Sequence, residues 1–137
     1  MARELFIDTS GFFALLVARD PKHAAADRIL KKSRAEKRLL LTTDYVLDET
    51  ATLLKARGAP SLVEPLFVHV LESQACRIQW MNADRFAAVR AFFRKHSDQE
   101  WSFTDCLSFC IMKERKLQDA LTTDLHFEQA GFIALLR

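Results

Sequence analysis

Two aspartates stand where a short apolar run gives way to a turn. Asp8 directly follows residues 5–7, and Asp124 ends the short segment that begins at Leu121. Side chains that follow the strands of a parallel sheet lie at its C-terminal edge, which is where ligands bind in such sheets. Capping of the next helix is an alternative explanation for either aspartate. The two positions therefore predict helix caps or one shared acidic site.

Two further acids lie on predicted helices beside apolar residues. Glu49 falls on the flank of the apolar stripe that includes Val46, whereas Asp48 points away from this stripe. A carboxylate beside apolar groups needs a partner or a metal ion, unless it extends past them into water. Asp105 is the sole acid in the first three turns of a helix that is apolar around most of its circumference. Its spacing from Ser102 also resembles a capping box, which is the alternative role.

Four carboxylates gathered at one sheet edge would repel one another unless cations neutralise them. Ligation by oxygen alone selects hard ions, so the sequence predicts a Mg²⁺ site in which Mn²⁺ can substitute. The predicted catalytic and metal-binding residues are Asp8, Glu49, Asp105 and Asp124. Zinc is not expected, because neither the cysteines nor the histidines have the spacing of a zinc site. The histidines are His23, His69, His96 and His126.

The segments that would position these acids alternate between strands and helices. Apolar runs predict strands at residues 5–7, 39–41, 77–81, 120–122 and 132–136. Helical spacing predicts helices at residues 12–16, 23–37, between Thr43 and Gly58, at 61–74, after Asn82, at 102–112 and at 125–130. Strands separated by helices imply a parallel sheet covered on both faces. The right-handed crossover rule and the absence of hairpin turns favour an α/β fold, a three-layer α/β/α sandwich whose strand order stays open.

The composition is that of one compact domain spanning residues 1–137. Half of the residues are hydrophobic, eleven are Phe, and Gly and Pro number three each, which argues against a disordered or loop-dominated chain. A domain of this size buries roughly 70% of the surface of its unfolded chain, which is enough to fold alone. The net charge of +2 is the difference between 20 basic and 18 acidic residues, so total charge does not predict nucleic-acid binding.

The cysteines and the hydropathy pattern bear on the cellular compartment. Cys76, Cys106 and Cys110 are odd in number and form no C-x-x-C pair, which is typical of buried thiols in a reducing compartment. The chain reaches Asp8 before an apolar signal region could form, and no later apolar run approaches the roughly 18 residues of a membrane span. We therefore expect a cytoplasmic protein with no membrane segment.

Four segments of the chain match the motifs of a known family. They are Phe6 to Ser10, Tyr45 to Thr50, Ser102 to Cys106, and Leu121 to Phe127 with Gly131 and Phe132 after it. With these segments in this order and at these spacings, the chain resembles the PIN-domain ribonucleases, and within them the VapC-like toxins of toxin–antitoxin modules. The resemblance extends over the whole chain.

This resemblance implies a four- or five-stranded parallel sheet and a Mg²⁺ or Mn²⁺ site made by the same four acids. It implies an endoribonuclease that hydrolyses RNA phosphodiester bonds and serves as the toxin of a type II toxin–antitoxin system. Hydroxyl groups near the metal or phosphate are implied at positions where local capping is the alternative: Thr9, Ser10, Ser102 and Thr104. Some relatives carry a further acid where this chain has His126, so a fifth carboxylate ligand is not expected.

The resemblance also implies RNA as the substrate, a cognate antitoxin protein as a partner, and a homodimer. An acidic pocket repels phosphate, so RNA must be held by cations around its rim. Candidate cations lie on the predicted second helix and its flank, at Arg19, Lys22, Lys31, Lys32 and Arg34. A solvated helix face is the alternative explanation for this basic stretch.

Other classes of protein share parts of this pattern. A receiver-like signalling module has the same architecture, but it needs paired acids after the first strand, and here Thr9 and Ser10 follow Asp8. It also needs an acceptor Asp after the third strand, where this chain has Met81 and Asn82. A PIN fold that only binds other proteins would not need all four acids. A housekeeping PIN-type nuclease that processes RNA is the alternative that the sequence leaves open.

Overall fold

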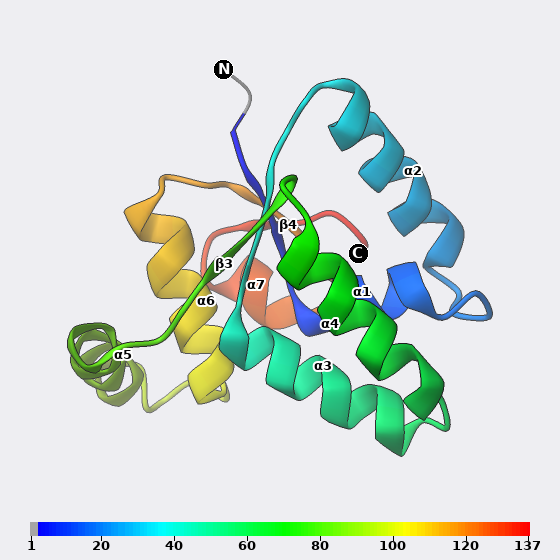
Figure 1. Cartoon of the computed structure of the whole chain (residues 1–137). Helices are drawn as coiled ribbons and strands as arrows, with labels where there is room; N and C mark the ends of the chain where they lie inside the picture. The colour runs from blue at the N-terminus through cyan, green and yellow to red at the C-terminus, as the bar shows by residue number, and fades with distance from the viewer. Residues whose placement is uncertain (1–2) are drawn as a thin grey trace.

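The computed structural model describes residues 3–137 and contains a five-stranded sheet (Figure 1). All neighbouring strands are parallel, and their order is β3-β2-β1-β4-β5. The strands are β1 (Leu5–Ile7), β2 (Leu40–Thr43), β3 (Cys76–Gln79), β4 (Asp119–Leu121) and β5 (Ile133–Ala134). The predicted parallel sheet is confirmed, and the strand order places β1 at its centre.

The helices form the two outer layers of the predicted α/β/α sandwich. They are α1 (Thr9–Leu16), α2 (His23–Ala35), α3 (Asp44–Ala56), α4 (Val63–Glu72) after the 3-10 turn η1 (Pro60–Leu62), α5 (Ala83–Lys95), α6 (Phe103–Glu114) and α7 (Leu125–Gln129). Helices α1 to α4 pack together on one side of the sheet, and α5 to α7 lie on the other (Figure 1). Within residues 3–137, no helix is both long enough and apolar enough to cross a membrane.

The direction in which strands are added to the sheet reverses at its centre. After β1 the chain adds β2 and then β3 on one side, and it returns to the other side of β1 to add β4 and β5. Such a reversal separates the loops that leave the two neighbouring strands, so a crevice forms between the C-terminal ends of β1 and β4. Asp8 follows β1 and Asp124 follows β4 within three residues.

Several helix boundaries differ from the prediction by one to three residues, among them the end of α2, which falls at Ala35 instead of residue 37. Two of the differences have a local cause. The first helix begins at Thr9 rather than Phe12, because Asp8 is an extended N-cap residue whose carbonyl accepts the Phe12 N–H at 3.0 Å. The predicted helix at 61–74 is divided into η1 and α4. Pro65 has no N–H to donate to the carbonyl of Ser61, so an α-helix beginning at residue 61 would lack this bond.

The core is centred on β1 and α6. All three residues of β1 are fully buried, and most residues of α6 from Asp105 to Met112 are buried as well. Phe109 of α6 packs edge-on against Phe127 of α7, with ring centroids 4.9 Å apart. Burial of each such side chain contributes roughly 1.5–3 kcal/mol to stability. The elements that carry Asp8 and Asp105 are therefore anchored in the core.

The cysteines are free thiols. Cys106 is buried, and Cys76 and Cys110 are half-buried. Burial raises the pKa of the Cys76 and Cys106 thiols to about 11. Both thiols therefore stay protonated at neutral pH and are poor nucleophiles.

Candidate active site

The four predicted acids come from four elements that meet at the C-terminal edge of the sheet. Asp8 is the N-cap of α1, and Asp124 is the N-cap of α7. Glu49 lies in the second turn of α3, and Asp105 lies in the first turn of α6. The beginnings of these helices lie near one another at the lower centre of Figure 1. The charges of Asp105 and Glu49 both act on Asp8, which places the three carboxylates in one electrostatic site.

Asp8 is a buried carboxylate held by hydroxyl groups. Its side chain is not a helix cap, so the capping alternative is wrong for this residue. Its Oδ2 accepts a hydrogen bond from Thr122 Oγ1 at 2.9 Å and one from Ser10 Oγ at 3.4 Å. Burial raises the pKa of Asp8 to about 7, and the charges of Asp105 and Glu49 add to this effect against the opposing hydrogen bonds. A cation beside Asp8 would favour its ionised form.

Glu49 faces the site, and its neighbour Asp48 does not. Glu49 Oε1 accepts a hydrogen bond from Thr9 Oγ1 at 2.7 Å, which ties α3 to the first residue of α1. Asp48 instead lines a surface groove that also includes Leu47 and Trp80. The direction predicted from helical phase is therefore the one observed, although Glu49 is exposed rather than buried.

Asp105 forms the capping box that was the alternative to a metal-binding role. Its Oδ2 accepts the backbone N–H of Ser102 at 3.1 Å, and its own N–H donates to Ser102 Oγ at 3.0 Å. The same Oδ2 lies 2.9 Å from Nδ1 of His126. Within residues 3–137, Oδ1 of Asp105 has no hydrogen-bond partner, so one oxygen caps the helix while the other is available to a ligand. Burial raises the pKa of Asp105, against the hydrogen bond from His126.

Asp124 also caps a helix and still faces the other acids. Its Oδ1 accepts the backbone N–H of His126 at 2.9 Å. Its own backbone N–H donates to Thr122 Oγ1 at 3.0 Å, and that hydroxyl in turn donates to Asp8. Thr122 is fully buried, so one hydroxyl fixes the spacing between the two acids that follow β1 and β4.

The predicted hydroxyl helpers divide into two groups. Thr9 donates to Glu49, and Ser10 lies 3.0 Å from Thr122 Oγ1, so both contact residues of the site. Ser102 acts as the N-cap of α6. Thr104 makes no side-chain hydrogen bond within residues 3–137, and its carbonyl accepts from Ser108 Oγ at 3.1 Å. Thr122 is the buried hydroxyl that sequence reasoning missed, because its partner Asp8 lies 114 residues away.

His126 is the second side chain that the sequence analysis did not assign to the site. One donor atom from each of Asp105, Asp124 and His126 lies within 4.8 Å of the other two. Two carboxylates and an imidazole are a suitable donor set for a divalent metal ion, so this cluster can hold one. The sequence did contain a local signal for the position of His126. An N-cap Asp accepts the backbone N–H of the residue two positions later, and His126 is two positions after Asp124. Partial burial works to lower the pKa of His126, but the Asp105 hydrogen bond and the charges of Asp124 and Asp105 raise it overall.

The structure does not bring the predicted RNA-binding cations to these acids. They belong to α2 and the loop before it, and α2 leads into the N-terminal end of β2 at the opposite edge of the sheet. Lys31 is paired with Asp27 at 2.8 Å, and Arg19 donates to the carbonyl of Arg57 at 3.1 Å. A role in RNA binding stays a prediction for Arg19, Lys22, Lys31, Lys32 and Arg34.

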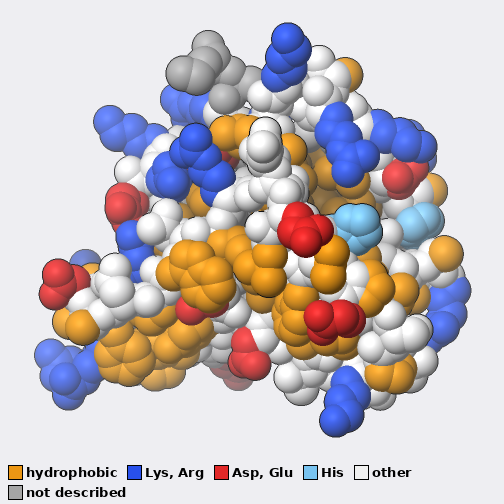
Figure 2. Space-filling view, viewed as in Figure 1, with side chains coloured by type: hydrophobic (Ala, Val, Ile, Leu, Met, Phe, Trp, Pro, Cys, Tyr) orange, Lys and Arg blue, Asp and Glu red, His pale blue; other side chains and the backbone are white. Residues whose placement is uncertain are grey.

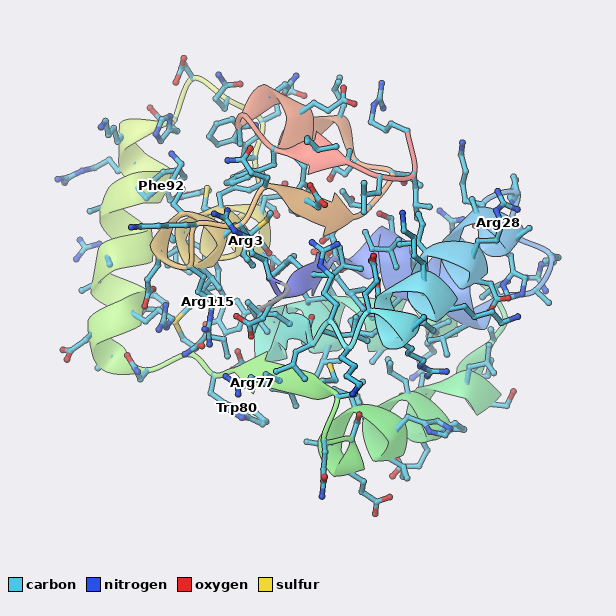
Figure 3. The ribbon with its side chains drawn as sticks, turned by 90° about the horizontal axis from the view of Figure 1, so that it is seen from above. Arg3, Arg28, Arg77, Trp80, Phe92 and Arg115 are labelled. Atoms are coloured by element: carbon cyan, nitrogen blue, oxygen red, sulfur yellow. The ribbon has the colours of Figure 1, made fainter. Side chains whose placement is uncertain are left out.

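Other cations gather at the edge of the sheet where the strands begin. Figure 3 looks onto this edge and shows Arg3, Arg77 and Arg115 around it. Arg115 is paired with Glu4 at 3.0 Å, so part of this charge is neutralised. A second pair at this edge joins Arg38 to Asp119 at 3.3 Å, so these arginines lie among acids at the end of the strands opposite the candidate site.

Known proteins resemble the chain along nearly its whole length. The PIN domain model matches residues 5–133. The 23S rRNA-specific endonuclease VapC20 of two strains of Mycobacterium tuberculosis is 32% identical over 130 residues, which are 94% of this chain and 95% of the relative. The crystal structure of Mycobacterium tuberculosis VapC20, described as a Sarcin-Ricin loop cleaving toxin, matches with a TM-score of 0.81 and 30% identity. That match covers 95% of this chain and 97% of the other.

These similarities agree with the fold and the motifs. The predicted PIN-like α/β/α fold is confirmed by the structural match, and the predicted class, a VapC-like endoribonuclease, is confirmed by the named relatives. The metal-binding acids remain predictions that the geometry supports. The chain belongs to the PIN domain family.

Proposed function

We propose that Asp8, Glu49, Asp105 and Asp124 bind Mg²⁺ or Mn²⁺ and that the protein uses this site to cleave RNA as the toxin of a type II toxin–antitoxin module. The observation that supports the proposal is that Asp8 and Asp124 follow β1 and β4, the two strands at the switch point, and that the charges of Asp105 and Glu49 act on Asp8. A bound divalent ion lowers the pKa of a water ligand and stabilises charge on the oxygens around phosphorus.

The residues of the chain prepare the site before a metal ion binds. Thr122 and Ser10 hold Asp8, the capping box holds Asp105, and Thr9 holds Glu49. A cation that binds among buried or partly buried acids relieves the repulsion between their charges. Metal binding therefore costs little conformational entropy, because the side chains that would bind the ion are already held by hydrogen bonds.

The direct test is cleavage of defined RNA by the purified protein. The curated relatives are specific for 23S rRNA, so the first substrate is a synthetic hairpin of the Sarcin-Ricin loop, compared with an unrelated hairpin of equal length. We expect endonucleolytic cleavage in Mg²⁺ or Mn²⁺, products with 5′-phosphate and 3′-hydroxyl ends, and no cleavage in chelator. Absence of cleavage of every RNA in both metals would contradict the proposal.

A housekeeping RNA-processing role is the competing function for the same chemistry. The two roles differ in what happens when the protein is produced alone. A toxin arrests growth within one induction, and coproduction of its cognate antitoxin restores growth. A processing nuclease leaves growth intact and alters the ends of a mature RNA instead.

The proposed antitoxin has two candidate contact surfaces. One is the acidic site itself, where a basic side chain would neutralise the carboxylates. The other is an apolar groove between α1, α2 and α4, lined by residues that include Phe12, Leu30 and Val70. Hydrogen exchange measured on the free toxin and on the complex would show which surface becomes protected.

We propose that the homodimer forms through an aromatic face beside the acidic site. This aromatic face consists of Tyr45, Phe86, Phe93 and Phe103. The ring of Phe103 lies 5.2 Å from that of Phe86 and 5.5 Å from that of Phe93, measured between centroids. Phe86 is 44% exposed and Phe93 is 42% exposed. Helix α5 packs mainly on α6 and stands apart from α3 in Figure 1, and Figure 2 shows hydrophobic side chains gathered in this region.

A further inference from the structure

The orientation of His126 is set by its own backbone and by two acids. Its N–H donates to Asp124 Oδ1 at 2.9 Å, which fixes the first turn of α7. Its ring Nδ1 then lies 2.9 Å from Asp105 Oδ2 and 3.5 Å from Asp124 Oδ1. One ring nitrogen therefore faces two carboxylates that come from different helices.

These separations are those of ligands that share one metal ion. Donor atoms bound at about 2.1 Å lie roughly 3.0 Å apart when adjacent and roughly 4.2 Å apart when opposite in an octahedral shell. Nδ1 of His126 lies 2.9 Å from Asp105 Oδ2, close to the separation of adjacent donors, and 3.5 Å from Asp124 Oδ1, between the two values. One donor atom from each of the three residues lies within 4.8 Å of the other two, so a small closing movement would bring three donors around one ion.

A purely positioning role for His126 explains the contacts less well. Asp105 is already oriented without it, because the capping box with Ser102 fixes the same carboxylate oxygen. The other oxygen of Asp105 has no hydrogen-bond partner within residues 3–137.

We propose that His126 is a nitrogen ligand of the metal ion, which it binds through Nδ1 together with Asp105 and Asp124. This inference rests on the proposed function, because it assumes that the acidic site holds the metal. In the bound state the ring carries its hydrogen on Nε2. Imidazole is a better ligand for first-row transition ions than for Mg²⁺, which prefers oxygen. The site therefore favours Mn²⁺ over Mg²⁺ more strongly than four carboxylates would.

The experiment is pulsed electron paramagnetic resonance of the full chain loaded with Mn²⁺, which detects ¹⁴N of a directly bound imidazole. His126→Gln is compared with His69→Gln, a control at an exposed position on α4. We expect ¹⁴N coupling in the parent and in His69→Gln, and none in His126→Gln. Calorimetry should show that His126→Gln weakens Mn²⁺ binding by about tenfold or more and Mg²⁺ binding by much less.

A second variant separates loss of the ligand from loss of folding. His126→Asp keeps a metal-binding oxygen, so it should bind Mn²⁺ without the nitrogen signal. The assignment is overturned if the parent binds no Mn²⁺, if it binds Mn²⁺ without ¹⁴N coupling, or if the coupling persists in His126→Gln.

RNA cleavage measured on the same samples distinguishes this inference from the proposed function. Cleavage without nitrogen coupling would leave the nuclease assignment standing and remove His126 from the metal. Nitrogen coupling in a protein that cleaves no RNA would support the ligand and contradict the nuclease.

Discussion

Asp8 illustrates at the residue scale how a buried acid can oppose folding until a cation is present. Its pKa is about 7 in the folded protein and has an ordinary value of 3.8, so between these values the folded state holds a proton that the unfolded chain has released. Stability of the metal-free protein should therefore fall as pH rises through this window, and this contribution should be fully lost above pH 7.

The measurement is thermal unfolding in chelator at pH 5 and pH 8, with Asp8→Asn as the comparison. We expect the parent to lose on the order of 5 °C more than the variant between the two pH values. Millimolar Mg²⁺ at pH 8 should restore the parent and have little effect on Asp8→Asn. Equal pH dependence in both proteins would show that Asp8 is not the group responsible. The same variant should abolish RNA cleavage and toxicity at unchanged abundance.

Two adjacent acids on α3 provide a second test at the residue scale. Glu49 accepts a hydrogen bond from Thr9 in the site, whereas Asp48 lines a groove on another side of the helix. We expect Glu49→Gln to lower the rate of RNA cleavage in Mn²⁺ by about a hundredfold, or about 2.7 kcal/mol of transition-state stabilisation. Asp48→Asn should stay within a factor of about two. A larger loss at Asp48 would mean that the wrong face of α3 has been assigned.

At the scale of elements, the close approach of α1 to β4 sets the distance between the acids. Gly11 lies where a Cβ atom would clash with the carbonyl oxygen of Leu121. Gly11→Ala should therefore push the start of α1 away from β4, at a cost of about 1–3 kcal/mol, and weaken Mn²⁺ binding. The affected contact is the one between Asp8 and Thr122.

Gly58→Ala is the matched control for this prediction. Gly58 has φ of +76°, so alanine there is strained, but its Cβ would meet no atom within 4 Å. This variant should also lose stability, by about 1 kcal/mol, and should bind Mn²⁺ as the parent does. If both variants lost metal affinity equally, the effect would come from general destabilisation and not from the approach of α1 to β4.

At the scale of the whole molecule, the aromatic face lies beside the acidic site, and we predict that it forms the dimer interface. A stable interface buries roughly 1,200 Å² or more in total, and aromatic residues are enriched at its centre. We expect light scattering to show a dimer at micromolar concentration and Phe93→Ser to convert it to a monomer. Val68→Ser, which replaces a hydrophobic side chain of 43% exposure on α4, should leave the dimer intact. A parent that is monomeric would remove the dimer proposal and leave the nuclease proposal untouched.

The sequence by itself determined the features that depend on neighbours a few positions away. Thr43 and Asn82 stand just before predicted helices, and each side chain caps its helix by accepting the N–H of the residue three positions on. The ends of the predicted strands located Asp8 and Asp124 at the C-terminal edge of the sheet. Helical phase placed Glu49 on the flank of the apolar stripe of its helix. These signals are local, because a cap or a helical face is set by residues within one or two turns. From the sequence, capping and metal binding are alternative roles for Asp105. The structure shows that one carboxylate oxygen caps the helix while the other stays available to a ligand.

Only the tertiary structure decided which of these local features meet. The order β3-β2-β1-β4-β5 puts the ends of β1 and β4 side by side, and this pairing joins Asp8 to Thr122, 114 residues away. It also brings His126 to Asp105, 21 residues earlier, so that a histidine the sequence did not assign to the site becomes a candidate ligand. The same topology places α2 and its cations toward the opposite edge. Patterns with a period of two or 3.6 residues carry no information about such long-range pairing, because strand order is fixed by packing of the whole sheet.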